Sequence, residues 1–135
     1  MCVANAARSQ LAEGVAKQLL GDRAEIHSAG SRPASVHPMT TVVLGEMGVD
    51  CSLLYSKGTD DLPQDFVDQL DYVITLCAEE VCPAVISKAK KLHWPLPDPA
   101  NPSYGDDEQL TAFRWTREEI RRRLESFQSE LNRSE

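Results

Sequence analysis

The sequence predicts an α/β protein with a parallel sheet and one layer of helices on each face of that sheet. Segments of strand character alternate with helical segments along the whole chain. The run YVITLC at 72–77 is continuous, apolar and rich in β-branched residues, which is typical of a strand buried in a parallel sheet. The length of 135 residues and the apolar fraction of 41% favour one domain with one core and exclude a disordered chain.

The first helix is predicted over 9–20, because apolar residues recur at every fourth position and Gly21 follows the last of them. The segment AEIHSAG at 24–30 is predicted to be a short strand that ends in a turn. A second helix is predicted within 37–50, where Pro38 suits the first turn.

Two more helices and two strands complete the prediction. PQDFVDQLD at 63–71 indicates a short helix, and the strand at 72–77 follows it directly. KKLHWPLPDP at 90–99 predicts a strand that runs into a loop ordered by prolines. The tail at 108–131 is predicted to be helical, because it carries apolar residues at helical spacing, namely Phe113, Ile120, Leu124, Phe127 and Leu131.

The charge of the chain limits its partners. The formal net charge is −7, so the overall field repels nucleic acid and anionic membranes, and an anionic substrate must be captured by local donors. No apolar run approaches the ~20 residues of a membrane span, and no secretory signal opens the chain. We therefore expect a soluble, cytoplasmic monomer that binds neither nucleic acid nor membranes.

The chain contains four cysteines, Cys2, Cys51, Cys77 and Cys82. In a cytosolic protein such residues are core, metal-binding or catalytic. They lack the C-x2-C spacing of zinc knuckles, and the three histidines form no cluster with ligand spacing. No bound metal is expected from this pattern.

The opening stretch MCVANAARSQ has the form C-x5-R-S just before the first predicted helix. A loop of this form can direct its backbone N–H groups and the helix N-terminus at one anion, while Arg8 adds a planar fork for two oxygens. Such surroundings lower the pKa of a thiol, so Cys2 is the candidate nucleophile, and Ser9 can donate a hydrogen bond to its sulfur. The expected oxyanion-binding residues are Val3, Ala4, Asn5, Ala6, Ala7 and Arg8.

Two further features lie where the carboxyl ends of strands are predicted. Cys77 ends the strand at 72–77, and Cys82 follows it by five residues. Asp98 stands in the proline-ordered loop, where a carboxyl group could protonate a leaving oxygen. Ligands of parallel sheets bind at such ends. Taken singly, C-x5-R occurs often by chance, Cys77 could be a buried small side chain, and Asp98 could be a turn former.

Five stretches in the same order and spacing carry a resemblance to a known family: CVANAARSQLAEG, IHSAGSRPASVHP, MGVDCS, YVITLCAEEVCP and HWPLPDPA. They resemble the thioredoxin-coupled arsenate reductases, which are built on the low-molecular-weight tyrosine phosphatase fold. The resemblance implies a three-layer fold with a four-stranded parallel sheet. It also implies the role of each site residue.

The resemblance assigns the first chemical step to the opening loop. Cys2 would attack arsenate, and Arg8 would bind its oxygens. Ser9 would stabilise the thiolate, and Asp98 would protonate the departing hydroxide.

The resemblance assigns the later steps to the other cysteines. Cys77 would attack the adduct and release arsenite, forming a Cys2–Cys77 disulfide. Cys82 would convert this bond into Cys77–Cys82, which thioredoxin would reduce. No bound cofactor is expected, since thioredoxin would supply the electrons. Cys51 matches no catalytic cysteine of the family and is predicted to be a core residue.

The chain departs from the family pattern at a cation site. Some members bind potassium behind the loop through residues that match Asn5, Glu13 and Ser28 and through a later acidic residue. Lys57 stands where that acid is aligned, so its ammonium group could replace the metal.

A second departure is the strand that precedes the nucleophile in this fold and lies in the middle of the sheet. The chain has no such segment before Cys2. The prediction is therefore a single domain over residues 1–135 that is truncated at its N-terminus and lacks the first, central strand.

Two other function classes stay open at this point. A tyrosine phosphatase acting through a Cys2 phosphocysteine would use the same loop and Asp98. Such enzymes usually place aromatic residues right after the D-P pair, whereas here Ala100 stands two past the acid and Tyr104 is the nearest aromatic residue after Asp98. The third class is a non-catalytic remnant that binds oxyanions. Only the reductase would lose two free thiols for each arsenate that it converts.

Overall fold

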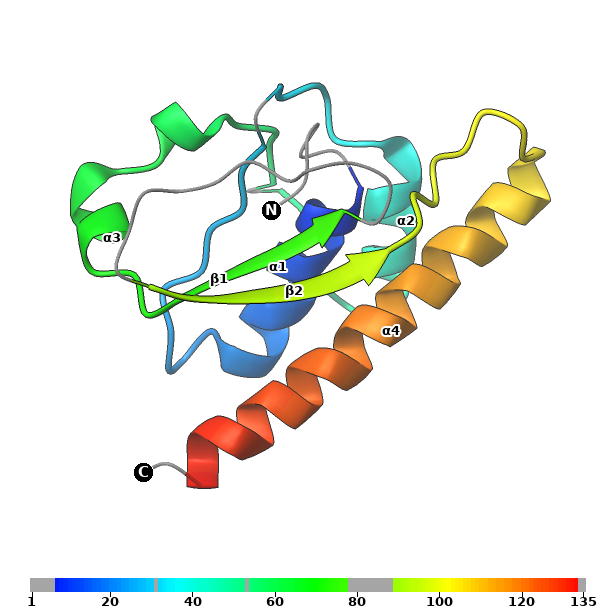
Figure 1. The fold of residues 1–135 in the computed structure, drawn as a ribbon. Helices are drawn as coiled ribbons and strands as arrows, with labels where there is room; N and C mark the ends of the chain where they lie inside the picture. The colour runs from blue at the N-terminus through cyan, green and yellow to red at the C-terminus, as the bar shows by residue number, and fades with distance from the viewer. Residues whose placement is uncertain (1–6, 31, 53, 78–88, 134–135) are drawn as a thin grey trace.

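The structure is a computed structural model that describes residues 7–30, 32–52, 54–77 and 89–133 (Figure 1). Its elements follow the predicted alternation in most places. In chain order they are α1 (Arg8–Leu20), α2 (Pro38–Gly45), a short 3-10 helix (Thr59–Asp61), α3 (Gln64–Asp68), β1 (Tyr72–Cys77), β2 (Lys90–Leu96) and α4 (Asp106–Arg133).

The two strands form a parallel pair. Their register runs from Tyr72 opposite Lys90 to Cys77 opposite Leu96, with an irregularity after Thr75. Pro95 lies within the irregular stretch of β2 and has no N–H group to donate, so a β-bulge is accommodated there. The strands predicted at 72–77 and within 90–99 are confirmed, and their pairing agrees with the predicted parallel sheet.

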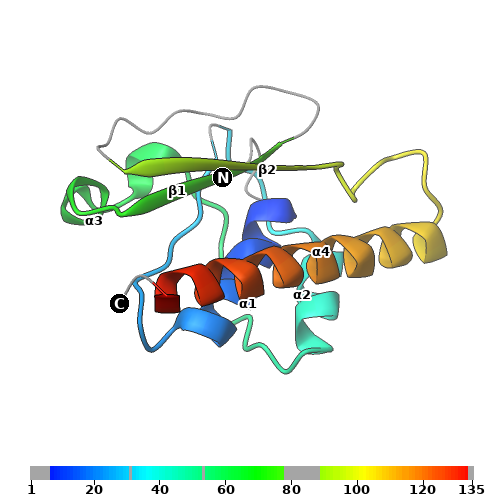
Figure 2. The same ribbon diagram turned by 60° about the horizontal axis from the view of Figure 1, so that its bottom comes forward.

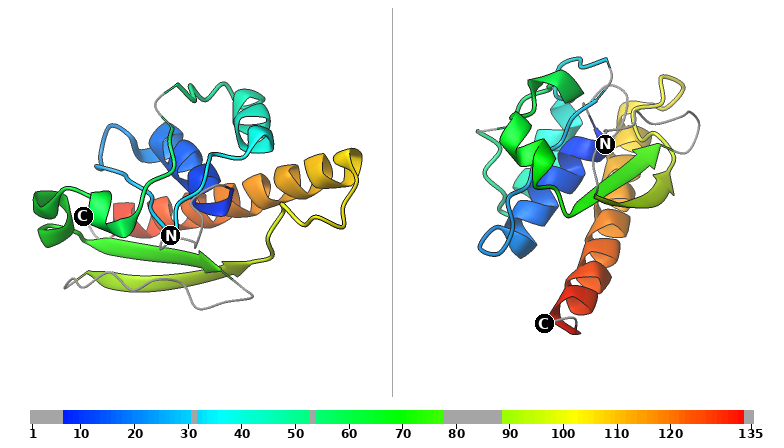
Figure 3. Two further views of the ribbon diagram at one scale, coloured as in Figure 1. Left: turned by 90° about the horizontal axis from the view of Figure 1, so that it is seen from above. Right: turned by 60° about the vertical axis from the view of Figure 1, so that its left-hand side comes forward.

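The described residues show part of the predicted layers. In the described part of the chain, α1, α2 and α4 lie on the same side of β1 and β2 (Figure 2). Figure 3 shows this arrangement from above, with α4 running along the length of the strands. Of the expected four-stranded sheet with a helical layer on each face, the described ranges contain two parallel strands and the helices of one face.

The strand predicted at 24–30 is wrong. Over the described residues this segment takes part in only one bridge, between Gly30 and Gly58. Gly30 N donates to Lys57 O at 3.0 Å, and Thr59 N donates to Gly30 O at 3.2 Å. Residues 24–29 have strand composition, but a strand is defined by pairing with a neighbour, and a cavity separates this segment from β1.

The core lies between the sheet and the helices on that one face. Helix α1 is at its centre, and Leu11 and Val15 of the predicted apolar stripe are fully buried. A Cβ atom on Gly14 would lie 2.7 Å from Leu44 Cδ1, so glycine permits the close approach of α1 and α2. The other buried core residues include Val43, Leu76, Leu96, Phe113, Ile120 and Leu124.

Helix α2 begins as predicted and ends early. His37 is its N-cap, and Nδ1 of His37 accepts a hydrogen bond from Met39 N at 3.1 Å, while Pro38 occupies the first turn. The helix ends at Gly45, and Gly48 lies in the following turn with a φ of 76°. This left-handed conformation favours glycine.

Helix α4 is longer than predicted and is held against α2 by an ionic cluster. The Glu46 carboxylate accepts hydrogen bonds from Arg114 Nε at 3.1 Å and from Arg117 Nη1 at 2.7 Å. Arg117 Nη1 also donates to Val43 O at 2.9 Å. No helix in the described part of the chain combines the length and apolar character that a membrane span requires.

The cluster predicts a pH dependence of stability. The hydrogen bonds from Arg114 and Arg117 lower the pKa of Glu46 from 4.5 to about 2. A lowered pKa in the folded state contributes stability that is present above pH 4.5 and is lost as the pH falls towards 2. In Glu46→Gln we expect the free energy of unfolding to depend less steeply on pH over that window, measured by urea unfolding at each pH. Arg114→Met removes the main cause of the lowered Glu46 pKa and should also make the free energy of unfolding less dependent on pH. If both variants kept the pH dependence of the wild type, the assignment of this dependence to the Glu46 cluster would be contradicted.

Candidate active site

The carboxyl ends of β1 and β2 bring three of the predicted site elements together. Cys77 ends β1 and lies opposite Leu96, which ends β2. Arg8, the first residue of α1, donates from Nη1 to Leu96 O at 2.8 Å. Asp98 follows Leu96 by two residues, so the arginine, the cysteine and the loop with the carboxyl group share one edge of the sheet.

The first turn of α1 has the electrostatics of an anion site. Helix N-termini carry partial positive charge and exposed N–H donors, and they normally favour acidic residues. Here the N-cap is Ala7, which has no capping side chain, and the first turn contains Arg8 and no acidic residue. Arg8 is only 5% exposed, and Ser9 beside it is 1% exposed. A buried cation at the positive end of a helix is expected where an anion binds.

The two cysteines in the described part of the chain differ from each other. Cys77 is buried and disulfide-bonded, whereas Cys51 is a free thiol packed at the edge of the core. Burial, together with the charge of Asp50, raises the pKa of the Cys51 thiol. A thiol with a raised pKa is a poor nucleophile at neutral pH. Cys51, predicted to be a core residue, is partly buried and packs against the core.

The remaining members of the predicted site lie outside the described residues. They are Cys2, Val3, Ala4, Asn5, Ala6 and Cys82.

Asp98 is exposed in the loop that follows β2. Its Oδ1 accepts a hydrogen bond from Ala100 N at 2.9 Å, which fixes one carboxylate oxygen in a local turn. The side chain lines a surface groove of about 630 Å³ between this loop and the first half of α4.

Two aromatic residues line that groove, of which the sequence analysis considered Tyr104 and missed Trp115. Tyr104 and Trp115 line it together with Asp98, and their side chains are 39% and 50% exposed. Trp115 lies between Arg114 and Thr116 on α4, away from the buried stripe of that helix. A large aromatic residue out of phase with the apolar stripe was the available signal, since the stripe alone accounts for the packing of α4.

A buried ionic cluster lies behind the site. Glu13 Oε1 accepts hydrogen bonds from Ser28 N at 2.8 Å and Ser28 Oγ at 2.7 Å, and Lys57 Nζ lies 3.1 Å from the same oxygen. Lys17 Nζ lies 3.0 Å from Oε2. Burial raises the pKa of Glu13, but the hydrogen bonds from Ser28, Lys17 and Lys57 and the charge of Lys57 outweigh it, so the pKa lies below its ordinary value.

The cluster does not fit a potassium ion. Of the residues expected to hold it, Glu13 and Ser28 are in contact, and Asn5 lies outside the described residues. The Lys57 side chain is 5% exposed, and its ammonium group also lies 3.3 Å from Tyr55 O, so this group already occupies the position of a cation beside the carboxylate. A potassium ion on the same carboxylate oxygen would meet a like charge at short range.

The cluster predicts unequal roles for the two lysines that contact Glu13. Lys57→Met leaves a buried carboxylate without its buried partner and is expected to cost about 3–5 kcal/mol of unfolding free energy. Lys17→Met removes a partner whose side chain is 44% exposed and is expected to cost at most ~1 kcal/mol. Chemical denaturation of both variants measures the difference.

A third variant separates charge from packing. Glu13→Gln combined with Lys57→Met removes both charges, and it should recover part of the stability lost in Lys57→Met alone. If Lys57→Met and Lys17→Met lost equal amounts of unfolding free energy, Lys57 would contribute no more to the stability of the buried Glu13 than Lys17 does.

Three comparisons place the chain among known proteins. The family model described as low molecular weight phosphotyrosine protein phosphatase matches residues 1–135. An arsenate reductase from Halalkalibacterium halodurans is 37% identical over 129 residues, which are 94% of this chain and 91% of that protein. One from Bacillus subtilis is 36% identical over the same shares of the two chains.

Solved structures agree in fold. An arsenate reductase in the phosphate binding state superposes with a TM-score of 0.78 at 30% identity, covering 96% of this chain and 93% of that one. A thioredoxin-dependent arsenate reductase from Corynebacterium glutamicum gives a TM-score of 0.72 at 32% identity, covering 99% of this chain and 60% of that one.

Proposed function

Because the chain belongs to the low-molecular-weight phosphotyrosine protein phosphatase family and is similar to arsenate reductases over nearly its whole length, we propose that it reduces arsenate to arsenite. The observation that best supports this proposal is the placement of Cys77. This buried, disulfide-bonded cysteine ends β1 directly opposite Leu96, whose carbonyl oxygen holds Arg8. The cysteine proposed to carry the redox chemistry therefore lies at the same edge of the sheet as the arginine proposed to bind the anion.

The first step is nucleophilic attack on arsenate. The Cys2 thiolate attacks arsenic(V), while Arg8 and the N-terminus of α1 bind the arsenate oxygens. A hydroxide leaves arsenic, and Asp98 protonates it to water. Phosphate and sulfate have the same tetrahedral oxyanion geometry and compete with arsenate. Ser9 stabilises the thiolate by donating a hydrogen bond to sulfur.

The second step is the reduction itself. The Cys77 thiolate attacks the Cys2 sulfur, the sulfur–arsenic bond breaks, and its electron pair reduces arsenic(V) to arsenic(III). Arsenite leaves, and a Cys2–Cys77 disulfide holds the two oxidising equivalents. Attack of Cys82 on Cys77 then forms Cys77–Cys82 and frees the Cys2 thiolate for the next turnover.

The reductant in this proposal is thioredoxin, which returns the Cys77–Cys82 disulfide to two thiols by supplying two electrons. The similarity to a thioredoxin-dependent arsenate reductase supports this choice. A cytoplasmic location belongs to the same proposal, because each cycle begins from reduced thiols.

We also propose that the protein does not depend on potassium, because the Lys57 ammonium group neutralises Glu13 from within the fold. The wild-type protein should show the same melting temperature and the same arsenate turnover in KCl and in NaCl of equal ionic strength. A higher melting temperature in KCl alone would contradict the proposal.

Phosphate-monoester hydrolysis is a second candidate, and one observation favours it. Tyr104 and Trp115 stand beside Asp98 in the same groove and could flank an aromatic leaving group. This reaction would use Cys2 and Asp98 but would leave Cys77 without a role.

Substitution of single cysteines tests the relay. Cys82→Ser should release one equivalent of arsenite and then stall as Cys2–Cys77, while Cys77→Ser should release none. Cys51→Ser is the matched control and should turn over like the wild type, because Cys51 is a free thiol at the edge of the core. Arsenite is measured by chromatography, and free thiols are counted before and after arsenate is added.

Three outcomes would count against the scheme. Loss of no thiols, with phosphate released from an aryl phosphate, would favour the phosphatase. Repeated turnover of Cys82→Ser with thioredoxin would show that the reductant attacks Cys2–Cys77 directly. If the wild type released neither arsenite nor phosphate, only the third function class, non-catalytic oxyanion binding, would remain.

A further inference from the structure

A surface groove of about 630 Å³ lies between the loop that joins β2 to α4 and the first half of α4. We call it the aromatic groove, because Tyr104 of the loop and Trp115 of the helix line it with side chains that are 39% and 50% exposed. Figure 1 shows this loop (yellow) leading into the amino-terminal half of α4. A cleft of this volume can take up several ligand groups at once.

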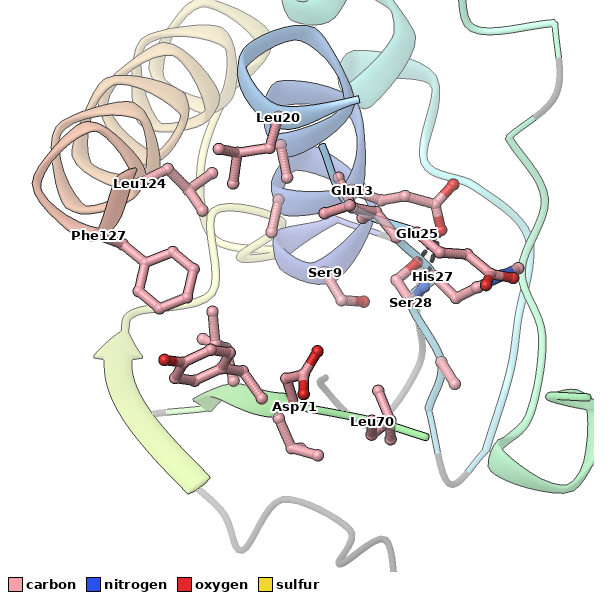
Figure 4. Close-up of a pocket in the computed structure, with 18 of the residues that line it drawn as sticks. Ser9, Glu13, Leu20, Glu25, His27, Ser28, Leu70, Asp71, Leu124 and Phe127 are labelled. Carbon is pink, nitrogen blue, oxygen red and sulfur yellow. Dashed lines mark hydrogen bonds and ion pairs between the residues drawn. The ribbon is translucent and has the colours of Figure 1, made fainter. Parts of the chain in front are cut away.

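The packing of α4 does not require Trp115. Figure 4 shows Leu124 and Phe127 of α4 on the interior side of that helix, where they line another cavity together with Leu20 of α1. Phe113 belongs to the same core and is fully buried. Two residues along an α-helix turn the side chain through about 200°, so Trp115 points away from Phe113 and towards the groove. A tryptophan that is half exposed on that side is typical of a binding surface.

The lining of the aromatic groove is negatively charged. Asp98 of the loop and Asp107 and Glu108 of α4 contribute carboxylates, and the described residues of the lining include no lysine or arginine. Acidic residues in the first turn stabilise a helix, which accounts for Asp107 and Glu108 alone. Asp98 belongs to a different segment, so helix stabilisation does not explain why the three side chains share one groove. Arg114, which precedes Trp115, donates from Nε to Glu46 of the segment after α2 at 3.1 Å.

Further along α4, carboxylates are neutralised within the helix. Glu118 lies 2.8 Å from Arg117 Nε, and Glu125 lies 2.9 Å from Arg121 Nε. Across the described ranges, no ion pair of this kind reaches the three carboxylates of the aromatic groove. Their charge is therefore available to a ligand that brings its own cation.

An aromatic surface flanked by carboxylates matches the chemistry of arginine. The guanidinium group is planar, stacks on aromatic rings and donates paired hydrogen bonds to carboxylates, whereas the ammonium group of lysine has no plane to stack. Free arginine would also bring its own carboxylate, which the three carboxylates of the groove would repel. An arginine within a polypeptide chain has no such group.

We propose that the aromatic groove is the docking site for an arginine side chain of a partner protein. The guanidinium group stacks on the indole ring of Trp115 and donates hydrogen bonds to the carboxylates of Asp107 and Glu108. This inference rests on the groove and does not depend on the proposed reaction. Because Asp98 lines the same groove, the docked partner would lie beside the edge of the sheet that holds Cys77 and Arg8.

The test titrates the full chain with the peptide acetyl-Ala-Ala-Arg-Ala-Ala-amide. The matched peptide carries citrulline in place of arginine, which keeps the shape of the side chain and removes its charge. NMR follows the indole N–H of Trp115 and the backbone amides of Thr111 and Ala112. We expect the dissociation constant of the arginine peptide to be about tenfold lower, because only the cation gains from the aromatic faces and the carboxylates.

Variants locate the binding in the aromatic groove. Trp115→Ala should weaken the binding of the arginine peptide about fivefold, and Glu108→Gln about threefold. Glu125→Gln is the matched control, since it removes the same charge from the same helix outside the groove, and it should bind the peptide like the wild type. Circular dichroism verifies that each variant is folded.

Three results would overturn the proposal. Equal dissociation constants for the arginine and citrulline peptides would show that the groove does not recognise the cation. Unchanged binding by Trp115→Ala would place the peptide elsewhere on the acidic surface. Equal weakening in Glu108→Gln and Glu125→Gln would show a response to overall charge and not to the groove.

Discussion

The buried carboxylate of Glu13 connects α1 to the segments around Ser28 and Lys57, which the β1–β2 pair does not hold. It binds the backbone and the hydroxyl group of Ser28 and pairs with Lys57, and so it ties α1 to two segments that belong to no described ladder. A carboxylate that is buried and charged is costly unless each oxygen has donors, and here each does. Because Glu13 lies little more than one turn from Arg8, the same contacts also fix the first turn of α1, on which the anion site depends.

The site concentrates positive potential in a protein that is otherwise acidic. The chain carries a net charge of −7, yet the first turn of α1 combines a buried guanidinium group with helix N–H donors and contains no carboxylate. An oxyanion is then attracted only at short range by the first turn of α1, because salt screens the charge of the surrounding acidic surface within ~10 Å. Selectivity rests on hydrogen-bond geometry rather than on net charge.

The sequence was sufficient where structure depends on neighbours along the chain. Leu11 and Val15 are buried because helical spacing alone places them on one face, and YVITLC forms a strand because its composition suits no other element. It was insufficient where structure depends on a distant partner. The segment 24–30 has strand composition but no ladder, and Trp115 reaches the groove of Asp98 only because α4 folds back beside that loop. The contact between Lys57 and Glu13 was proposed from a resemblance, since residues 44 positions apart carry no local signal of pairing.

The bulge in β2 limits how the chain can change in length. From His93 to Leu96 the chain advances three residues while β1 advances two, from Thr75 to Cys77. Deleting one residue from that stretch would make the spacing even, but it would reverse the side to which each later residue points. Leu96 would turn out of the core, and its carbonyl group would turn away from Arg8. A substitution near Pro95 leaves this register intact, whereas an insertion or deletion leaves it intact only in the loop beyond Asp98, where no strand register has to be kept.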